Sequence, residues 1–499
     1  MVWNKDSIKE IAKSRIGNRK FIIVSNREPY IHTYGEDGIV CSSTISGVAI
    51  ALDSVMQACG GIWIAHGSGE ADKDVVDSHD RVQIPPVEEQ PKSQAIGNNS
   101  KYTLRRVWLS KEEENGYYYG FANEALWPLC HLAYTRPYFR KSDWNMYRKV
   151  NEKFAEVVLE EIGNDPAFVF IQDYHFTLLP GILRERRPDL VLAQFLHEPW
   201  PTPESFRICP WNEEILDGLL KNDLIGFHIK YHTHGFLDIT QMIEAKVNYV
   251  KSSVTRGGRE TLVEAFPIGI DFEKTENIAK RPGMEEKLSN LRKKEHLMDR
   301  FVGVGIERID YIKGILEKFN AIDRFFEKYP EYLGRFTFLQ LGPVSRIHLP
   351  EYKKYNDELY HLMVDINEKY QLKDWKPIIL HKYSFSPEEV ISYYRLADVC
   401  IVSSVHEGMN LVSKEFVASR WDNNGVLILS KFTGAARELN EALLINPFAT
   451  DHFADTIKQA LEMPPKERTR RMRKMREIVR RNNVYRWAGK ITGTLRKLG

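Results

Sequence analysis

Short apolar runs, each followed by a long amphipathic stretch, recur along the whole chain and limit the folds that it can adopt. The runs are rich in Val, Ile, Leu and Phe at successive positions, which is typical of strands covered on both faces in a parallel sheet. We predict strands at 21–25, 62–66, 169–172, 192–197, 224–227, 263–268, 301–305, 336–341, 377–381, 399–403, 426–430 and 443–446. Helical periodicity fills the intervals, for instance 315–329 and 352–369. Repeated β–α units of this kind predict a doubly wound α/β architecture.

The chain is long enough for two such domains. At 499 residues it exceeds the length that one hydrophobic core usually supports, and the β–α pattern stands on both sides of a charge-rich stretch at 271–300. We place the boundary near 269–271 and expect the two domains to meet at a cleft, where ligands of such folds often bind. Gly, Pro, Asn and charged residues mark 35–38 and 87–100 as surface loops.

Composition excludes several classes of protein. With 43% hydrophobic and 28% charged residues the chain is globular, and a net charge of +2 favours no nucleic-acid partner. Its five cysteines lack C-x-x-C spacing, its first twenty residues lack an apolar signal core, and no apolar run reaches membrane-spanning length. A basic segment at 466–481 carries an apolar stripe, so we interpret it as an amphipathic surface helix. These features predict a cytoplasmic protein without membrane contact.

The most informative segment follows the predicted strand at 399–403. It runs from Ser404 through a glycine-containing loop into a predicted helix at 411–419, where free backbone N–H groups favour an anion. Two carboxylates, Glu407 and Glu415, flank the helix start. They would repel a bare phosphate but can accept two hydrogen bonds from a vicinal diol. Phosphate together with diols indicates a nucleotide sugar.

Cations follow the ends of other predicted strands. Arg308 and Lys313 come after the strand at 301–305, where they could hold both phosphates of a nucleotide diphosphate. A surface ion pair with Glu307 or Asp310 is the alternative. Arg27 lies in the turn that follows the first predicted strand, and Gly47 begins a helical pattern at which backbone can approach a phosphate, although that signal is weak alone.

Two neighbouring strands end in polar residues suited to a sugar. Asp173 follows the strand at 169–172, and His197 ends the strand at 192–197. The alternatives are a helix cap for Asp173 and a satisfied buried side chain for His197. An aromatic cluster at 117–128 includes Tyr118 and Trp127 and is more typical of a core than of a ligand platform.

These segments together resemble the trehalose-6-phosphate synthases, which are retaining glycosyltransferases of the GT-B fold. The resemblance covers nearly the whole chain. Its most specific pieces are SNR at 25–27, NEALWP at 123–128, QDYH at 172–175, PTP at 201–203, ERIDYIKG at 307–314, SR at 345–346 and GMNLVSKE at 408–415. It implies two Rossmann-like domains, 1–269 for the acceptor and 270–480 for the donor, and a terminal helix within 481–499 that packs back on the first.

The resemblance also implies roles for single residues. Donor contacts would come from Gly47, Arg308, Lys313, Glu407, Met409, Asn410, Leu411, Val412 and Glu415. Acceptor contacts would come from Arg27, Tyr118, Trp127, Asp173 and Arg346. The catalytic group would comprise Arg308, Lys313, His197, Asp173 and Glu407.

The implied reaction moves glucose from a nucleotide-glucose, with UDP-glucose expected, to glucose 6-phosphate. The departing diphosphate would be stabilised electrostatically, with no cofactor and no metal, and no Asp-x-Asp motif follows a strand in the second half. The nucleotide base, regulation and any homo-oligomer are not marked in the sequence.

Four positions depart from the family pattern. Glu407 and His406 stand where an aspartate and an arginine are usual, Glu198 replaces an aliphatic residue, and Ser46 replaces a glycine. The run 27–30 also resembles the glucosylglycerol-phosphate synthases, so glycerol 3-phosphate is the alternative acceptor.

Other classes fit the sequence less well. A non-catalytic sugar-phosphate sensor would be expected to lose Arg308 and Lys313, and both are present. A nicotinamide dehydrogenase lacks support because no G-x-G-x-x-G follows a strand. His228, His232 and His234 have no neighbouring acid or cysteine that would complete a metal site.

Overall fold

The computed structural model describes residues 3–17, 19–44, 47–84, 101–133, 135–370 and 372–495. Ser46 and the predicted loop at 87–100 lie outside these ranges. No helix in the described part of the chain is both long and apolar enough to cross a membrane. The chain divides into two compact units, one formed by 1–268 with 484–499 and the other by 269–483.

A ten-stranded sheet forms the centre of the first unit, in the order β10-β11-β12-β9-β8-β7-β1-β4-β6-β5. The sheet is parallel over seven consecutive strands, β12-β9-β8-β7-β1-β4-β6. The remaining strands, β10, β11 and β5, pair antiparallel with their neighbours. A separate hairpin joins β2 and β3. The strands are β1 (Lys20–Arg27), β2 (Tyr30–Gly35), β3 (Gly38–Ser43), β4 (Ile62–His66), β5 (Arg81–Ile84), β6 (Tyr102–Val107), β7 (Ala167–Gln172), β8 (Val191–Phe195), β9 (Leu224–Phe227), β10 (Lys246–Asn248), β11 (Ser253–Arg256) and β12 (Arg259–Ala265).

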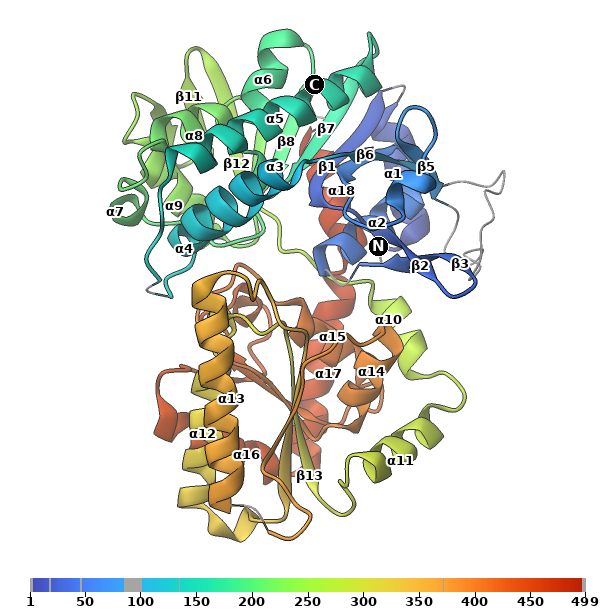
Figure 1. Ribbon diagram of the computed structural model, residues 1–499, viewed down its shortest axis with the longest axis vertical. Helices are drawn as coiled ribbons and strands as arrows, with labels where there is room; N and C mark the ends of the chain where they lie inside the picture. The colour runs from blue at the N-terminus through green and yellow to red at the C-terminus, as the bar shows by residue number, and fades with distance from the viewer. Residues whose placement is uncertain are drawn as a thin grey trace. The chain divides into compact units, whose positions relative to one another are not determined.

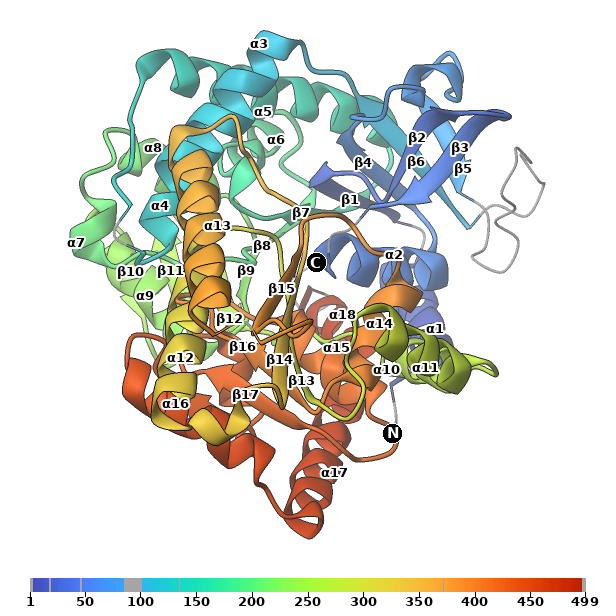
Figure 2. The ribbon, with the colours of Figure 1, turned by 60° about the horizontal axis from the view of Figure 1, so that its bottom comes forward.

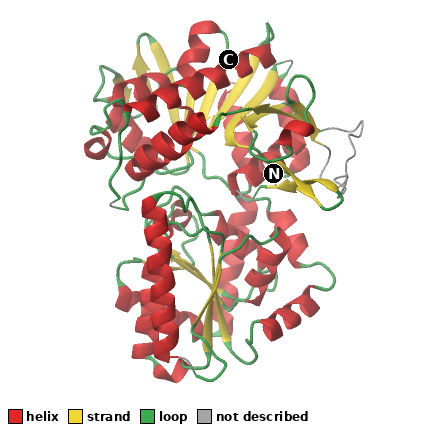
Figure 3. Ribbon diagram, viewed as in Figure 1, coloured by secondary structure: helices red, strands yellow, loops and turns green. Residues whose placement is uncertain are grey.

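Helices cover both faces of this sheet (Figures 1 and 3). One group contains α5, α6 and α8, and the other contains α1, α2 and α18 in mutual contact. The helices are α1 (Lys5–Ile16), α2 (Gly47–Cys59), η1 (Asp72–Asp74), α3 (Lys111–Glu114), η3 (Asn115–Leu126), α4 (Trp127–Cys130), α5 (Lys141–Ile162), η4 (Tyr174–Phe176), α6 (Leu179–Arg186), α7 (Pro203–Phe206), α8 (Asn212–Leu219), α9 (Lys230–Thr240) and α18 (Val484–Leu495). The last helix therefore joins the first unit, where Trp487 packs against Phe170 and Phe195 of β7 and β8.

The second unit has a six-stranded, fully parallel sheet in the order β15-β14-β13-β16-β17-β18. Its strands are β13 (Phe301–Ile306), β14 (Phe336–Leu341), β15 (Ile378–His381), β16 (Val399–Val402), β17 (Val426–Ser430) and β18 (Leu443–Ile445). Every residue of β14, β16 and β17 is buried, which explains their predominantly apolar sequences.

Two groups of contacting helices flank the second sheet as well (Figures 1 and 2). One comprises α12, α13 and α16, and the other comprises α10, α11, α14, α15 and α17. The bounds are α10 (Phe272–Ala279), α11 (Met284–Lys294), η5 (Tyr311–Lys313), α12 (Ile315–Lys328), η6 (Pro330–Tyr332), α13 (Pro350–Tyr370), α14 (Pro387–Leu396), α15 (Leu411–Ser419), η7 (Gly434–Arg437), α16 (Thr450–Leu461) and α17 (Pro465–Arg481). Each unit is thus a doubly wound α/β sheet, with its loops after the parallel strands gathered at one edge.

All twelve predicted strands are present, within a few residues of their predicted bounds. The sequence did not reveal β2, β3, β5, β6, β10 and β11. β5, β10 and β11 lie at the antiparallel margins of the sheet and β2 and β3 form the separate hairpin, and these partly exposed strands lack a continuous apolar run. The charge-rich stretch at 271–300 contains two helices, α10 and α11.

Candidate active site

Arg27 is the last residue of β1, and the structure brings its side chain to another predicted acceptor residue. Its Nη2 donates a hydrogen bond to the Tyr118 hydroxyl at 3.1 Å. The next residue, Glu28, is buried and accepts from Arg106 Nε at 2.8 Å and from the Ser68 backbone N–H at 2.8 Å. Burial raises the pKa of Glu28 to about 7 even though Arg106 opposes the shift. This buried ion pair anchors the chain immediately after Arg27.

Tyr118 and Trp127 are positioned by a stretch of π-helix. The twelve-residue η3 carries Tyr118 and leads directly into α4, which begins at Trp127. Such wide helical turns are rare and frequently occur at functional sites. Tyr118 stacks on His175 with 5.8 Å between ring centroids and is 9% exposed. The cluster is therefore both core and, at its Tyr118 hydroxyl, part of the predicted acceptor site.

Asp173 directly follows β7 and has a left-handed backbone, with φ at +69°. This conformation is strained for a residue other than glycine, and such strain often marks functional sites. One carboxylate oxygen accepts N–H groups from Tyr174 at 3.0 Å and His197 at 3.3 Å. Asp173 therefore caps the short helix η4, as the alternative considered from the sequence predicted. Burial, reinforced by the nearby charge of Glu198, raises the pKa of Asp173 well above its usual value.

His197 follows β8 and is buried beside Asp173. Its Nε2 donates to Gln172 Oε1 at 3.0 Å, an orientation fixed because Gln172 Nε2 donates to the Phe170 carbonyl. Burial lowers the pKa of His197 to about 4, so the ring is neutral near pH 7. Its buried Nδ1 has no hydrogen-bond partner among the described residues and can accept one from a sugar hydroxyl.

A second acid lies close to this group. Glu198 Oε2 is 3.0 Å from His131 Nε2, and the His131 ring packs 4.1 Å from that of Trp127. Gly47, the remaining donor residue predicted in the first unit, is the first residue of α2 and is only half-buried.

In the second unit, Arg308 follows β13 and does not pair with the acids considered from sequence. Glu307 pairs instead with the fully buried Lys318, and Gln340 donates to the same Glu307 oxygen at 2.9 Å. Asp310 lies 3.6 Å from Arg346 Nη1. The Arg308 guanidinium is half-buried at the carboxyl edge of the sheet.

Lys313 and Glu407 meet although 94 residues separate them. Lys313 Nζ is 2.6 Å from Glu407 Oε1, and the other Glu407 oxygen accepts from Ser404 Oγ at 2.7 Å and Asn410 Nδ2 at 3.0 Å. Gly314 follows Lys313 with φ at +62°, and Ser403 Oγ donates to the carbonyls of both. The turn that presents Lys313 is therefore tied to the end of β16.

The predicted donor segment forms the start of α15. Asn410 caps the helix, with its side-chain oxygen accepting the Ser413 N–H at 2.7 Å. Met409 is buried, whereas Leu411 and Val412 are half-buried at the first turn, which contains no acidic residue. No acidic residue in that first turn offsets the positive end of the helix dipole.

Glu415 lies on the same helix, and Tyr394 Oη donates to it at 3.3 Å. Burial raises the pKa of Glu415 to about 7. Two hydrogen bonds donated by a diol would favour the ionised form of the Glu415 carboxyl.

Arg346 is held next to the cationic loop of β13. Its Nη1 donates to Tyr352 Oη at 2.6 Å, and its backbone is left-handed with φ at +46°. Burial raises the pKa of Tyr352, and the charges of Arg346 and Arg308 oppose that rise, so both guanidiniums lie near this hydroxyl.

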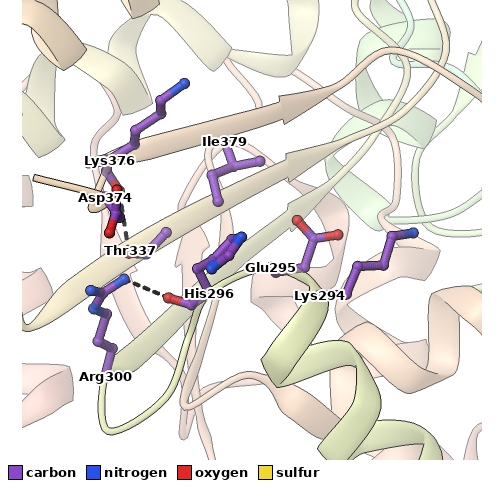
Figure 4. A pocket seen from close by; sticks show the side chains of 8 residues that line it. All are labelled: Lys294, Glu295, His296, Arg300, Thr337, Asp374, Lys376 and Ile379. Carbon is purple, nitrogen blue, oxygen red and sulfur yellow. Dashed lines mark hydrogen bonds between the residues drawn. The ribbon is translucent and has the colours of Figure 1, made fainter.

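A surface pocket of the second unit is lined mainly by charged side chains, including Lys294, Arg300, Asp374 and Lys376 (Figure 4). Arg300 precedes β13 and Lys376 precedes β15, so the pocket lies at the amino ends of the parallel strands. The predicted donor residues follow the carboxyl ends. The pocket is therefore separate from the candidate site.

Three residues that contact side chains at or beside the candidate site were not identified from the sequence. His131 contacts Glu198, Arg106 donates to Glu28, and Gln172 accepts from His197. His131 directly follows the short helix that begins at Trp127, and nothing in its sequence position marked it as a partner of Glu198.

Comparison with known proteins identifies the family of this chain. The family model of Glycosyltransferase family 20 matches residues 19–497. The alpha,alpha-trehalose-phosphate synthase [UDP-forming] of Schizosaccharomyces pombe is 32% identical over 99% of this chain and 93% of its own length. The corresponding enzyme A of Dictyostelium discoideum is 35% identical over 94% of this chain, which spans only 61% of that protein.

Solved structures show the same fold. The E. coli protein bound with UDP-2-fluoro glucose has a TM-score of 0.82 and 30% identity, covering 96% of this chain and 99% of its own. A Burkholderia xenovorans alpha,alpha-trehalose-phosphate synthase (UDP-forming) in complex with glucose-6-phosphate has a TM-score of 0.83 and 28% identity, covering 95% and 99%. The predicted fold class, GT-B with two doubly wound domains, is confirmed. Because the family model matches residues 19–497 and relatives align over nearly all of its length, this chain belongs to glycosyltransferase family 20.

Proposed function

We propose that this protein transfers glucose, with retention of anomeric configuration, from UDP-glucose to glucose 6-phosphate and so forms trehalose 6-phosphate. The observation that carries the proposal is the set of cations and helix N–H groups at the carboxyl edge of the second sheet: Arg308, Lys313 and the start of α15. These groups can stabilise a departing nucleotide diphosphate. The names of the relatives, which are UDP-forming, support the choice of donor.

Lys313 has a defined task in this mechanism. In the free protein it neutralises Glu407, whose other oxygen is already held by Ser404 and Asn410. A bound diphosphate would compete for the Lys313 ammonium, while Glu407 keeps two donors and can accept from a glucose hydroxyl. Glu415 would hold the ribose diol, and Arg308 would share the diphosphate charge.

The acceptor is proposed to bind through the first unit's Arg27, Tyr118, Trp127 and Asp173, with Arg346 contributing to its phosphate. The direct Arg27–Tyr118 hydrogen bond supports one phosphate site for this pair. The neutral His197 ring would accept from a hydroxyl of the donor glucose. As the bond between the anomeric carbon and the diphosphate oxygen breaks, the acceptor hydroxyl bonds to that carbon on the same face and gives its proton to the leaving diphosphate, whose charge the fixed cations stabilise.

A product screen tests the proposal. Purified protein is incubated with UDP-, GDP- or ADP-glucose and with glucose 6-phosphate or glycerol 3-phosphate, and nucleotide diphosphate and disaccharide phosphate are measured. Release of UDP and formation of trehalose 6-phosphate are expected. Turnover with glycerol 3-phosphate alone would replace the proposed acceptor, and binding without turnover would indicate a sensor.

A further inference from the structure

We propose that Lys318 is a positioning residue for donor binding: by holding Glu307 in the core of the second unit, it keeps the charge of Arg308 available to the nucleotide diphosphate. This inference rests on the proposed function and adds to it a residue outside the motif at 307–314. Its basis is the contact of Glu307, which directly precedes Arg308 in the chain but pairs with Lys318 instead.

The Lys318 side chain is part of a small buried polar group. Lys318 belongs to the first turn of α12, and its side chain is fully buried. Its Nζ pairs with Glu307 Oε1 and donates to Gln340 Oε1 at 3.1 Å, and Gln340 Nε2 donates to the same Glu307 oxygen at 2.9 Å. Charges removed from water in this way are stable only when they are paired and hydrogen-bonded. Lys318 and Glu307 therefore hold each other in place as a neutral pair.

The surrounding core is shaped for an ammonium at this position. A Cβ added at Gly305 would lie 2.5 Å from Lys318 Nζ and 2.8 Å from Gln340 Oε1. Any larger residue at Gly305 would thus displace the polar group. Lys318 Nζ also lies 5.4 Å from the centre of the Phe338 ring, whose face attracts a cation.

Arg308 stands between two anchored residues and keeps its charge. The N–H groups of Glu307 and Ile309 donate to carbonyl groups in and after β14 at 3.1 and 3.0 Å, which fixes the backbone of Arg308 at the edge of the sheet. The Arg308 guanidinium has no ion pair or hydrogen bond with any described residue. Lys313, by contrast, is paired with Glu407. Of these two cations, only Arg308 is uncompensated in the free protein.

Both acids that flank Arg308 are engaged elsewhere. Asp310 is fully buried, its Oδ1 accepts a backbone N–H at 3.2 Å, and its other oxygen lies 3.6 Å from Arg346. Glu307 is held by Lys318. A carboxylate in contact with Arg308 would cancel the field that attracts an anion, most strongly where water is excluded. Lys318 thus prevents an ion pair that adjacency in the chain would otherwise favour.

The test removes the cation from the buried pair. In Lys318→Met the Glu307 carboxylate loses its partner, and an ionised acid that is buried alone is drawn to the adjacent Arg308. At pH 8 the dissociation constant of UDP, or of the nucleoside diphosphate released in the product screen, should rise about 10- to 100-fold, the range of a lost hydrogen bond to a charged group. Affinity for the nucleoside without phosphate, measured by competition, should hardly change. Calorimetric titration gives both constants.

Removal of the acid should restore binding. Lys318→Met combined with Glu307→Gln leaves no carboxylate that can turn to Arg308, so most of the affinity for the diphosphate should return. Glu307→Gln alone should also keep that affinity. A role in packing alone predicts the opposite, because the double variant removes more of the buried group than Lys318→Met does.

Lys328→Met is the matched control. Lys328 lies at the other end of α12 and pairs with Asp455, so its loss should leave diphosphate affinity unchanged. If Lys318→Met does not fold, Lys318→Gln gives the same comparison with a smaller rise, because its amide keeps an N–H donor for Glu307.

Three outcomes would overturn the inference. Unchanged diphosphate affinity in the folded Lys318 variant would show that Glu307 does not reach Arg308. Equal losses for diphosphate and nucleoside, or no recovery in the double variant, would show a packing role only. Failure of wild type to bind any nucleoside diphosphate would overturn the proposed function together with this inference, whereas the first two outcomes leave that function standing.

Discussion

Glu415 shows how burial alone can prepare a single residue for its ligand. Its pKa of about 7 means that the carboxylate form is populated only as pH rises through neutrality. If the carboxylate binds the ribose diol, the dissociation constant of UDP-glucose should be about tenfold larger at pH 6 than at pH 8. Calorimetric titration over this range measures the slope. Glu415→Gln should bind more weakly and show a flat profile, and an unchanged slope in that variant would contradict the assignment.

Arg346 is proposed to bind the acceptor phosphate, so its substitution should affect the acceptor and not the donor. Arg346→Ala should raise the Michaelis constant for glucose 6-phosphate about 10- to 100-fold, the effect of losing a charge-assisted hydrogen bond to phosphate. Donor affinity should change little. Tyr352→Phe removes the hydroxyl that holds Nη1 and serves as a control, with a smaller rise expected. Equal weakening of both substrates in steady-state kinetics would mean that Arg346 is misassigned.

At the scale of elements, the turn between β13 and α12 depends on one glycine. A Cβ added at Gly314 would lie 2.2 Å from the Ser403 carbonyl oxygen, and φ is +62°. Gly314→Ala should therefore destabilise the second unit by at least about 2 kcal/mol and displace Lys313, because both the strain and the backbone clash must be relieved. Chemical unfolding and UDP-glucose affinity measure the two effects.

Gly334→Ala is the matched control for that turn. Its φ is +74°, but a Cβ there meets nothing within 4 Å. It should cost only the left-handed backbone strain, about 1 kcal/mol, and leave donor affinity intact. If the two variants behaved alike, the close approach to Ser403 would have no consequence.

For the whole molecule, the two units are expected to respond separately to mutation. Trp487 of α18 is 2% exposed and packs on β7 and β8, far from it in sequence. Trp487→Ala should cost about 3–5 kcal/mol and lower the unfolding transition of the first unit only. Trp421→Ala in the second unit removes a side chain that is 40% exposed and should have a small effect. Calorimetry with and without UDP-glucose assigns each transition, and a shift of both by Trp487→Ala would contradict independent units.

Burial explains which elements the sequence revealed. Strands such as β14 and β16 are covered on both faces, so most of their residues are apolar and the pattern is visible. β6 was missed because it contains Arg105 and Arg106, which suggest a surface segment. Both arginines are buried, neutralised by Asp80, Glu161, Glu28 and Asp72 from other segments.

The amino-acid sequence by itself determined the two α/β units, their parallel strands and the cations and acids that follow the strand ends, because these depend on local apolar patterns and on motifs of consecutive residues. Only the tertiary structure decided which side chains meet: Arg27 with Tyr118, Lys313 with Glu407, and His131 with Glu198, pairs separated by 91, 94 and 67 residues. Such contacts, and the pKa shifts that burial imposes, arise when sheet pairing brings distant loops to one edge.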